Sequence, residues 1–539
     1  MLRRSRIDVL VGGAVVLIFA LVQGALLRGP RPWDPARYWD SAVHFAHPEA
    51  DLFNLRIGLI LPARVAVVLY GPSEAALYTV PLLAGMVLTA AVFGTMLLLF
   101  DDRVLAAGAA LATSLSAYYL IYSSFIFPDP LATAAFTAGI FFLVLGSRQE
   151  SSRRHIVSVV AAGALFSWAY LIREFSPLVL LPALVAALIV LRYKLREALV
   201  LAAAALATWV AEPLYGLVRY DEPFLHLRFL TGRGGEPISQ GRLARVEHIQ
   251  GQLDNVFDTL VVFPRLLVTW HVGWVFLGLL VLFVAALAAT RDRRLALLAA
   301  WLLSFWAVMA VLGLFTLSSG RWLLNITNIR YWSPALPPLV MGAFGGLALL
   351  ASGRPRIVRG IPILSAAVAV VTLIAVVPGV TQYRSCSRFW PADPLGRWHE
   401  LRSWLGTSEA QRYRVLLTDP QSRRYISAYS HSLFGRSLWD GQVNGVGRAG
   451  ELVPTTAPAD TLVLVNRDEF RFRDALQRIR VGWAPVFSSS DGMMVALAAK
   501  GPPPADAVTS ERWWQLPRDP LGSPRAHTCA MQPYYLRVK

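Results

Sequence analysis

The stretch DVLVGGAVVLIFALVQGALL, residues 8–27, is long and apolar enough to cross a bilayer, and WDPARYWD, residues 33–40, follows it closely. One helical span needs about 20 apolar residues. The first stretch has no small-residue cleavage site, so we expect a retained membrane helix rather than a removed signal. Asp34, followed by the pair Arg37-Tyr38, is then expected where the chain leaves the membrane.

Composition places the whole chain among integral membrane proteins. Of its 539 residues, 55% are hydrophobic and only 16% are charged, and the mean hydropathy is +0.49. A soluble domain cannot bury this much apolar surface. The net charge of +17 comes mainly from short arginine clusters between apolar runs, which is a pattern of membrane topology and argues against a nucleic-acid partner.

Apolar runs of sufficient length predict eleven transmembrane helices. They lie at about 8–27, 75–100, 104–122, 130–147, 156–172, 176–191, 198–218, 272–290, 295–316, 332–351 and 361–379. Alternate connectors carry the basic clusters, at Arg3/Arg4/Arg6, Arg103, Arg148/Arg153/Arg154, Arg192/Lys194/Arg196, Arg291/Arg293/Arg294 and Arg354/Arg356/Arg359. Because positive residues favour the cytoplasmic side, we expect a bacterial plasma-membrane protein with its N-terminus in the cytoplasm.

One further apolar segment, LRIGLILPARVAVVLY at 55–70, is predicted to lie along the outer membrane interface. It contains Arg56 and Arg64, and an arginine at a helix centre costs about 2.5–3.5 kcal/mol on insertion scales. A span here would also move the later basic clusters to the opposite side. An amphipathic interfacial helix avoids both problems.

The sequence changes character after about residue 380. Residues 414–419 and 461–466 are typical of buried strands, 484–499 of a hairpin, and 395–405 and 472–480 of helices. The predicted fold class is therefore a polytopic α-helical membrane domain, residues 1–380, followed by a small extracytoplasmic α/β domain, residues 381–539.

Both cysteines, Cys386 and Cys529, fall in the predicted outer domain. An oxidising compartment favours a disulfide between them. Two free thiols are the alternative.

The predicted topology collects several charged residues at the outer membrane face. They are Asp34, Asp40, Asp129, Arg173, Glu174 and Arg330, with His44 and the aromatic residues Tyr38 and Tyr331 nearby. Charged groups at the edge of a bilayer usually face protein or water and are candidates for function. Simpler roles are open: Asp129 before Pro130 suits an N-cap, Arg173 and Arg330 could snorkel to headgroups, and Asp34 could be an ordinary loop acid.

Four motifs in this order resemble family-39 glycosyltransferases, GT-C enzymes related to protein O-mannosyltransferases and lipid A aminoarabinose transferases. The resemblance covers about residues 8–350. The motifs are Asp-x-x-x-Tyr (34–38), Pro-Asp-x-Leu (128–131), Arg-Glu-x-x-x-Leu-x-Leu-Leu-Pro (173–182) and Arg-Tyr-x-x-Pro-x-Leu-Pro (330–337).

The resemblance implies transfer of a hexose or pentose from a polyprenyl-phosphate donor to an acceptor on the outer face, with inversion. It assigns the base to Asp34, an acceptor or metal role to Asp129, and the donor phosphate to Arg173, Arg330 and Tyr331. The family pattern is Asp-Glu where this chain has Asp34-Pro35, so any role of a second acid would fall to Asp40. Glu174, His44 and Tyr38 are secondary candidates.

This chemistry is also consistent with the residue types alone. A carboxylate can deprotonate an attacking hydroxyl, and guanidinium groups in a water-poor cavity stabilise a departing phosphate. A divalent metal, Mg²⁺ or Mn²⁺, could bridge acid and phosphate. The acceptor could be a glycan, a lipid or a protein. The competing hypotheses are a lipid or glycan transporter and a non-enzymatic envelope scaffold.

Overall fold

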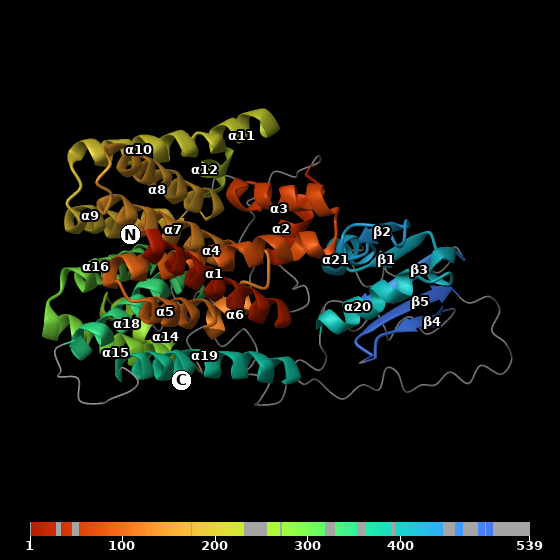
Figure 1. The fold of residues 1–539 in the computed structure, drawn as a ribbon. Helices are drawn as coiled ribbons and strands as arrows, with labels where there is room; N and C mark the ends of the chain where they lie inside the picture. Colours follow the sequence, from red (N-terminus) through yellow and green to blue (C-terminus); the bar gives the residue numbers. More distant parts are fainter. Residues whose placement is uncertain are drawn as a thin grey trace.

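A helical bundle with a small five-stranded sheet domain at one end forms the structure (Figure 1). This computed structural model describes residues 2–27, 34–45, 53–173, 175–230, 256–269, 272–317, 329–352, 363–389, 394–445, 459–466, 483–490 and 492–499.

Each segment that the sequence predicts to span is helical in the bundle, and the segments 104–122 and 198–218 are each divided into two helices. These helices are α1 (Leu2–Ala25), α4 (Glu74–Phe100), α5 (Arg103–Ser114), α6 (Ala117–Tyr122), α7 (Pro128–Ser147), α8 (Ser152–Ile172), α9 (Phe175–Leu191), α10 (Leu195–Trp209), α11 (Ala211–Tyr220), α15 (Gly273–Thr290), α16 (Arg293–Leu317), α18 (Leu336–Ser352) and α19 (Ile363–Phe389). The remaining helical segments are α2 (Asp34–Val43), α3 (Ile57–Tyr70), α12 (Leu225–Leu230), α14 (Val256–Thr269) and the 3₁₀ segment η1 (Ile329–Ala335).

The polytopic helical fold class is confirmed. Eight helices among the described residues are long and apolar enough to cross a membrane, so the number eleven stays a prediction. The segment at 104–122 falls short because it is divided into α5 and α6. At the division, the hydroxyls of Thr113 and Ser114 each donate to the carbonyl four residues earlier, at 2.8 Å, a bonding pattern that often bends helices.

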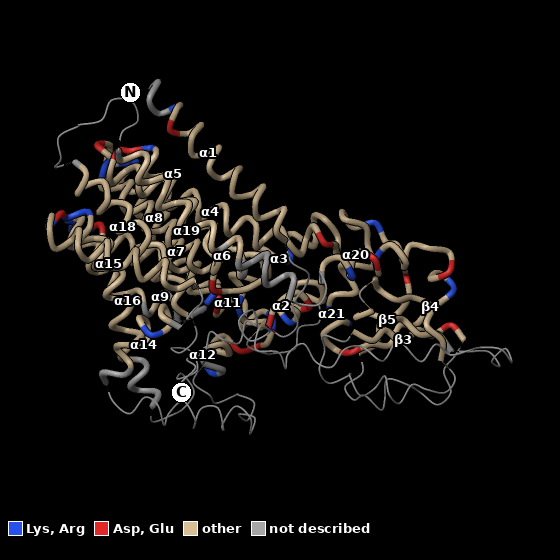
Figure 2. The backbone as a smooth tube through the Cα atoms, turned by 90° about the horizontal axis from the view of Figure 1, so that it is seen from below, with Lys and Arg blue, Asp and Glu red and all other residues tan. Residues whose placement is uncertain are grey.

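Three of the predicted inner connectors meet at one end of the bundle. Arg103 Nε lies 2.5 Å from Asp8 Oδ1, and Arg294 donates to the Leu99 carbonyl at 3.3 Å. Charged residues gather near the ends of the bundle and leave its middle largely uncharged (Figure 2). The alternation of inner and outer connectors and the cytoplasmic side of the membrane stay predictions.

The predicted interfacial segment forms α3, a single helix of 14 residues, which is shorter than the roughly 20 residues that cross a bilayer. Its basic residues turn toward α2. Arg56 is buried and donates to the Tyr38 hydroxyl, and Arg64 donates to the Val43 carbonyl at 3.1 Å. Because the last carbonyls of a helix lack partners within it, Arg64 stabilises the end of α2.

The C-terminal sheet has the strand order β2-β1-β3-β5-β4. The strands are β1 (Val415–Thr418), β2 (Gln442–Gly445), β3 (Thr461–Asn466), β4 (Trp483–Ser488) and β5 (Met494–Ala499). β1 pairs in parallel with β2 and β3, and the predicted hairpin forms the antiparallel pair β4–β5. The helices α20 (Pro394–Leu405) and α21 (Pro420–Tyr429) lie between this sheet and the bundle (Figure 1).

The predicted domain boundary at residue 380 lies inside a helix. The helix α19 continues to Phe389 and includes Cys386, so the helix that begins in the last predicted span extends past the predicted boundary at 380. Cys529 and residues 472–480 lie outside the described residues. The disulfide and the helix at 472–480 therefore stay predictions.

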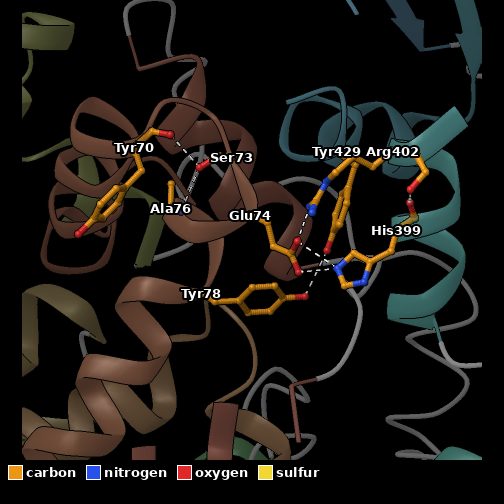
Figure 3. Close-up of polar contacts among 9 residues, drawn as sticks. Tyr70, Ser73, Glu74, Ala76, Tyr78, His399, Arg402 and Tyr429 are labelled. Atoms are coloured by element: carbon orange, nitrogen blue, oxygen red, sulfur yellow. Dashed lines mark hydrogen bonds and ion pairs between the residues drawn. The ribbon is translucent and has the colours of Figure 1, made fainter. Parts of the chain in front are cut away.

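A buried carboxylate joins the sheet domain to the bundle (Figure 3). Glu74, at the start of α4, is 5% exposed and lies 2.9 Å from Nε2 of His399. It also pairs with Arg402, whose guanidinium stacks 5.0 Å above the Tyr429 ring. The hydroxyls of Tyr78 and Tyr429 meet at 3.3 Å. These contacts fix α20 and α21 against the end of α4.

Replacing Glu74 with Gln is expected to loosen this attachment. Hydrogen bonds to a charged group contribute about 1.5–3 kcal/mol, and the amide keeps the shape but loses the charge that holds Arg402. Hydrogen exchange should then accelerate in α20 and α21 but not in α7 or α8. The exposed Glu409→Gln is the matched control. Unchanged exchange in α20 would show that Glu74 does not hold the domain.

Candidate functional site

The acid and the arginine of two separate motifs form a buried ion pair. Nε of Arg173, at the end of α8, lies 2.8 Å from Oδ1 of Asp129 in the first turn of α7, and their side chains are 3% and 2% exposed. The guanidinium carbon of Arg173 also lies 4.6 Å from the centre of the Tyr331 ring in η1. Three sequence-predicted residues therefore meet in one place.

The simpler role as an N-cap is wrong for Asp129. Helix α7 begins at Pro128 with Phe127 at the N-cap position, so Asp129 is already inside the first turn. Proline suits this first turn because its missing N–H would have no partner there. The carboxylate pairs with Arg173 at the end of the neighbouring helix α8.

Snorkelling is likewise wrong for Arg173. A snorkelling arginine keeps its charged end in water, whereas this guanidinium is held inside the protein by Asp129 and Tyr331. Arg330 lies beside Tyr331 in η1, but its side chain is outside what the structure describes, as is all of Glu174. The proposed phosphate role of Arg330 therefore stays a prediction.

Polar groups that sequence reasoning missed surround this pair. Thr133 Oγ1 donates to the Asp129 carbonyl at 2.9 Å and lies 3.0 Å from Ser333 Oγ. Tyr119 donates to the Ser333 carbonyl at 2.9 Å. All three side chains are buried. The signal for Thr133 was its position one helical turn after Asp129, on the same face; nothing local distinguished Tyr119.

Asp34 is the first residue of α2, not a residue of an extended loop, and its side chain is partly buried. Tyr38, one turn later, is completely buried and accepts a hydrogen bond from Arg56. Just after Arg56, Gly58 packs so closely on the last turn of α8 that an added Cβ would lie 2.7 Å from the Ile172 backbone nitrogen. The helix that carries Asp34 is thus linked through α3 to the end of the helix that precedes Arg173.

Asp40 and His44 face the sheet domain instead. Asp40 Oδ1 lies 2.9 Å from His44 Nδ1, and Oδ2 lies 3.5 Å from Arg424 Nε on α21. Because residues four apart share a face of a helix, Asp40 does not lie on the face of Asp34 and Tyr38. Arg37, by contrast, stacks 4.3 Å from the Phe53 ring.

The pair Asp40–His44 should make stability depend on pH. Burial alone would raise the pKa of Asp40, but the hydrogen bond and charge of His44 and the charge of Arg424 outweigh it, and the pKa is lowered from 3.8. The hydrogen bond to Asp40 raises the pKa of His44 from 6.5. The Asp40 contribution is lost as pH falls through its lowered pKa, and the His44 contribution is lost as pH rises through its raised pKa.

His44→Gln is therefore expected to cost most between about pH 4 and 6.5 and least above pH 8. The cost should stay below about 1 kcal/mol, because the pair is solvent-exposed. Apparent Tm measured across this range for the variant and the wild type tests it. Asp40→Asn is expected to destabilise in the same range and, because it also removes the contact with Arg424, to keep part of its cost above pH 8. A cost that grows with rising pH would contradict the assignment.

The described residues offer no ready set of ligands for a metal ion. Within the described ranges no group of three or more His, Cys, Asp and Glu side chains could hold one. Asp129, the acid that the resemblance connects with a metal, faces a guanidinium. The proposed sugar transfer uses no metal ion.

Solved structures with a similar fold are known. ArnT from Cupriavidus metallidurans in the apo state superposes with a TM-score of 0.58 and 14% identity over 91% of this chain and 97% of that chain. The same protein bound to undecaprenyl phosphate gives 0.54 and 15% over the same shares. The chain therefore shares its fold with ArnT. The resemblance predicted from its motifs is confirmed at the level of fold.

Other comparisons add less. An oligosaccharyltransferase from Archaeoglobus fulgidus, in complex with Zn and sulfate, has 13% identity over 84% of this chain and 68% of that chain. Its TM-score is 0.41. No protein-family model and no curated protein sequence matches.

Proposed function

We propose that this GT-C protein is a membrane glycosyltransferase that moves a sugar from a polyprenyl-phosphate donor to an acceptor hydroxyl. The observation that carries the proposal is the buried Asp129–Arg173–Tyr331 cluster in a fold shared with ArnT, a protein with a structure bound to undecaprenyl phosphate. Charged residues gathered at the bundle ends, rather than along its middle, favour this over a transporter.

Arg173 is the proposed partner of the donor phosphate. Its planar guanidinium suits phosphate oxygens, and burial strengthens such a contact because little water competes for it. Asp129 and Tyr331 hold the side chain in place from two sides. An arginine held in this way loses less side-chain freedom when the donor arrives.

Asp34 is the proposed base. The acceptor oxygen attacks the anomeric carbon while its proton passes to the Asp34 carboxylate. The bond from that carbon to the phosphate oxygen breaks, and polyprenyl phosphate leaves with the electron pair. Attack from the side opposite the leaving group inverts the anomeric configuration. Fixed guanidinium charge stabilises the leaving group as its negative charge grows.

The reaction is proposed to occur on the extracytoplasmic face of a bacterial plasma membrane, where the sheet domain would adjoin the acceptor. The basic connectors at the opposite end of the bundle support this orientation. The sugar would be a hexose or a pentose.

Incubation of the purified protein in vesicles with a set of polyprenyl-phosphate sugars tests the proposal. We expect one donor to be consumed with release of polyprenyl phosphate, and an inverted glycosidic bond in the product. Movement of intact donor between leaflets, with no donor consumed in the presence of envelope extract, would overturn it in favour of a transporter.

A further inference from the structure

The outward face of α3 is entirely aliphatic. Val65, Val68 and Leu69 are 58%, 67% and 67% exposed, and the other described side chains of this helix are buried or partly buried. Its arginine, Arg64, is partly buried, and its guanidinium donates to the Val43 carbonyl at the end of α2. A helix on a water-exposed surface normally shows the reverse pattern, with its charges outward.

A second apolar element lies in the sheet domain. Among the described residues from 394 onward, the large apolar side chains with high exposure are Leu433 and Phe434, at 46% and 70%. They occupy the tip of a turn that the bridge between His431 and Ser437 closes. Two adjacent exposed side chains of this size are costly in water.

The two elements lie against each other. The Ala75 backbone nitrogen donates to the Leu433 carbonyl at 3.2 Å, and the rings of Tyr70 and Phe434 lie 6.5 Å apart. Gly71, at φ +66°, is packed so that an added Cβ would come within 3.0 Å of the Gly435 α-carbon. The turn of the sheet domain is therefore seated directly on the end of α3.

We propose that this surface, formed by Val65, Val68, Leu69, Leu433 and Phe434, rests in the headgroup–acyl boundary of the lipid leaflet. The partner is lipid because α3 packs against α4 and α8, two helices long and apolar enough to span the membrane. Exposed aliphatic side chains also occur on α4, where Leu83 is 52% exposed. Apolar side chains at this boundary are stabilised by the acyl chains.

The sheet domain then has a lipid contact in addition to its protein attachment at Glu74. Contact through Leu433 and Phe434 would keep α21, and with it Asp40 on α2, at a fixed height above the bilayer. This lipid contact requires only that the bundle is embedded in the membrane, and it does not depend on the proposed sugar transfer.

Photocrosslinking in vesicles tests the lipid contact directly. The full chain carries p-benzoylphenylalanine in place of Phe434, and a second variant carries it in place of Val68. The control places it at Ser408, an exposed polar position of the same domain. After irradiation in phosphatidylcholine vesicles, mass spectrometry of the labelled peptide identifies the adduct.

We expect phosphatidylcholine adducts at 434 and 68 to exceed those at 408 by about tenfold, because an apolar side chain at the boundary contacts acyl chains. A protein–protein adduct at 434 would overturn the proposal in favour of a second copy of the chain. Lipid adducts no more frequent at 434 than at 408 would also overturn it. The variant at 68 keeps the test valid if substitution at 434 prevents folding.

Discussion

Asp34→Asn is expected to lower the rate of sugar transfer by about 10²–10⁴-fold, the usual contribution of a positioned general base. The amide keeps the size of the side chain but cannot accept the acceptor's proton. Donor binding should persist, because the proposed phosphate contact is made by Arg173. The measurement is the initial rate of donor consumption, beside the equilibrium binding of polyprenyl phosphate.

The matched control for this experiment is Asp101→Asn, at the C-terminal end of α4. Asp101 has a φ of +56°, a conformation that Asn tolerates well, so its transfer rate should be unchanged. Full activity in Asp34→Asn would reject Asp34 as the base. It would leave the phosphate role of Arg173 to be judged separately, by donor binding.

Arg173→Ala is expected to abolish donor binding and to reduce the free energy of unfolding by about 3–5 kcal/mol. The stability cost arises because removing one partner leaves the other charge, that of Asp129, inside the protein. Adding Asp129→Ala should restore part of the stability but none of the donor binding. Thermal unfolding and polyprenyl-phosphate binding, measured on the single and double variants, separate the two effects.

Arg148→Ala provides the comparison, because Arg148 is exposed at the end of α7, and surface substitutions usually change stability by less than about 0.5 kcal/mol. If the double variant were less stable than Arg173→Ala alone, the two residues would not act as a pair. If Arg173→Ala bound polyprenyl phosphate normally, the proposed donor site would be wrong while the fold assignment stood.

Local sequence patterns were sufficient to predict helices and strands whose formation depends on the residues of one short segment. Apolar runs predicted helices because the length of a run fixes whether it can cross lipid. The strand at 461–466 was correct because a short β-branched run bounded by polar residues suits a buried strand. The helical start of α2 at Asp34 was missed, since its Pro35 can mark either a turn or a first helical turn.

A single motif was less informative about which partner a charged side chain contacts. Asp129 before Pro130 matched an N-cap, and only the position of α8 beside α7 revealed the pairing with Arg173. Glu74 was not singled out from the sequence, and it contacts His399 and Arg402 in the sheet domain. These contacts join residues far apart in the chain.

The sequence by itself determined that this is a multi-pass helical membrane protein with a small α/β domain, because span length and charge asymmetry are properties of short segments. The tertiary structure decided that Asp129, Arg173 and Tyr331 meet, and that Phe434 packs near Tyr70 at the end of α3. Those meetings depend on which helices pack side by side. That choice is made by close contacts such as Gly58 on Ile172, which no periodicity within one segment can specify.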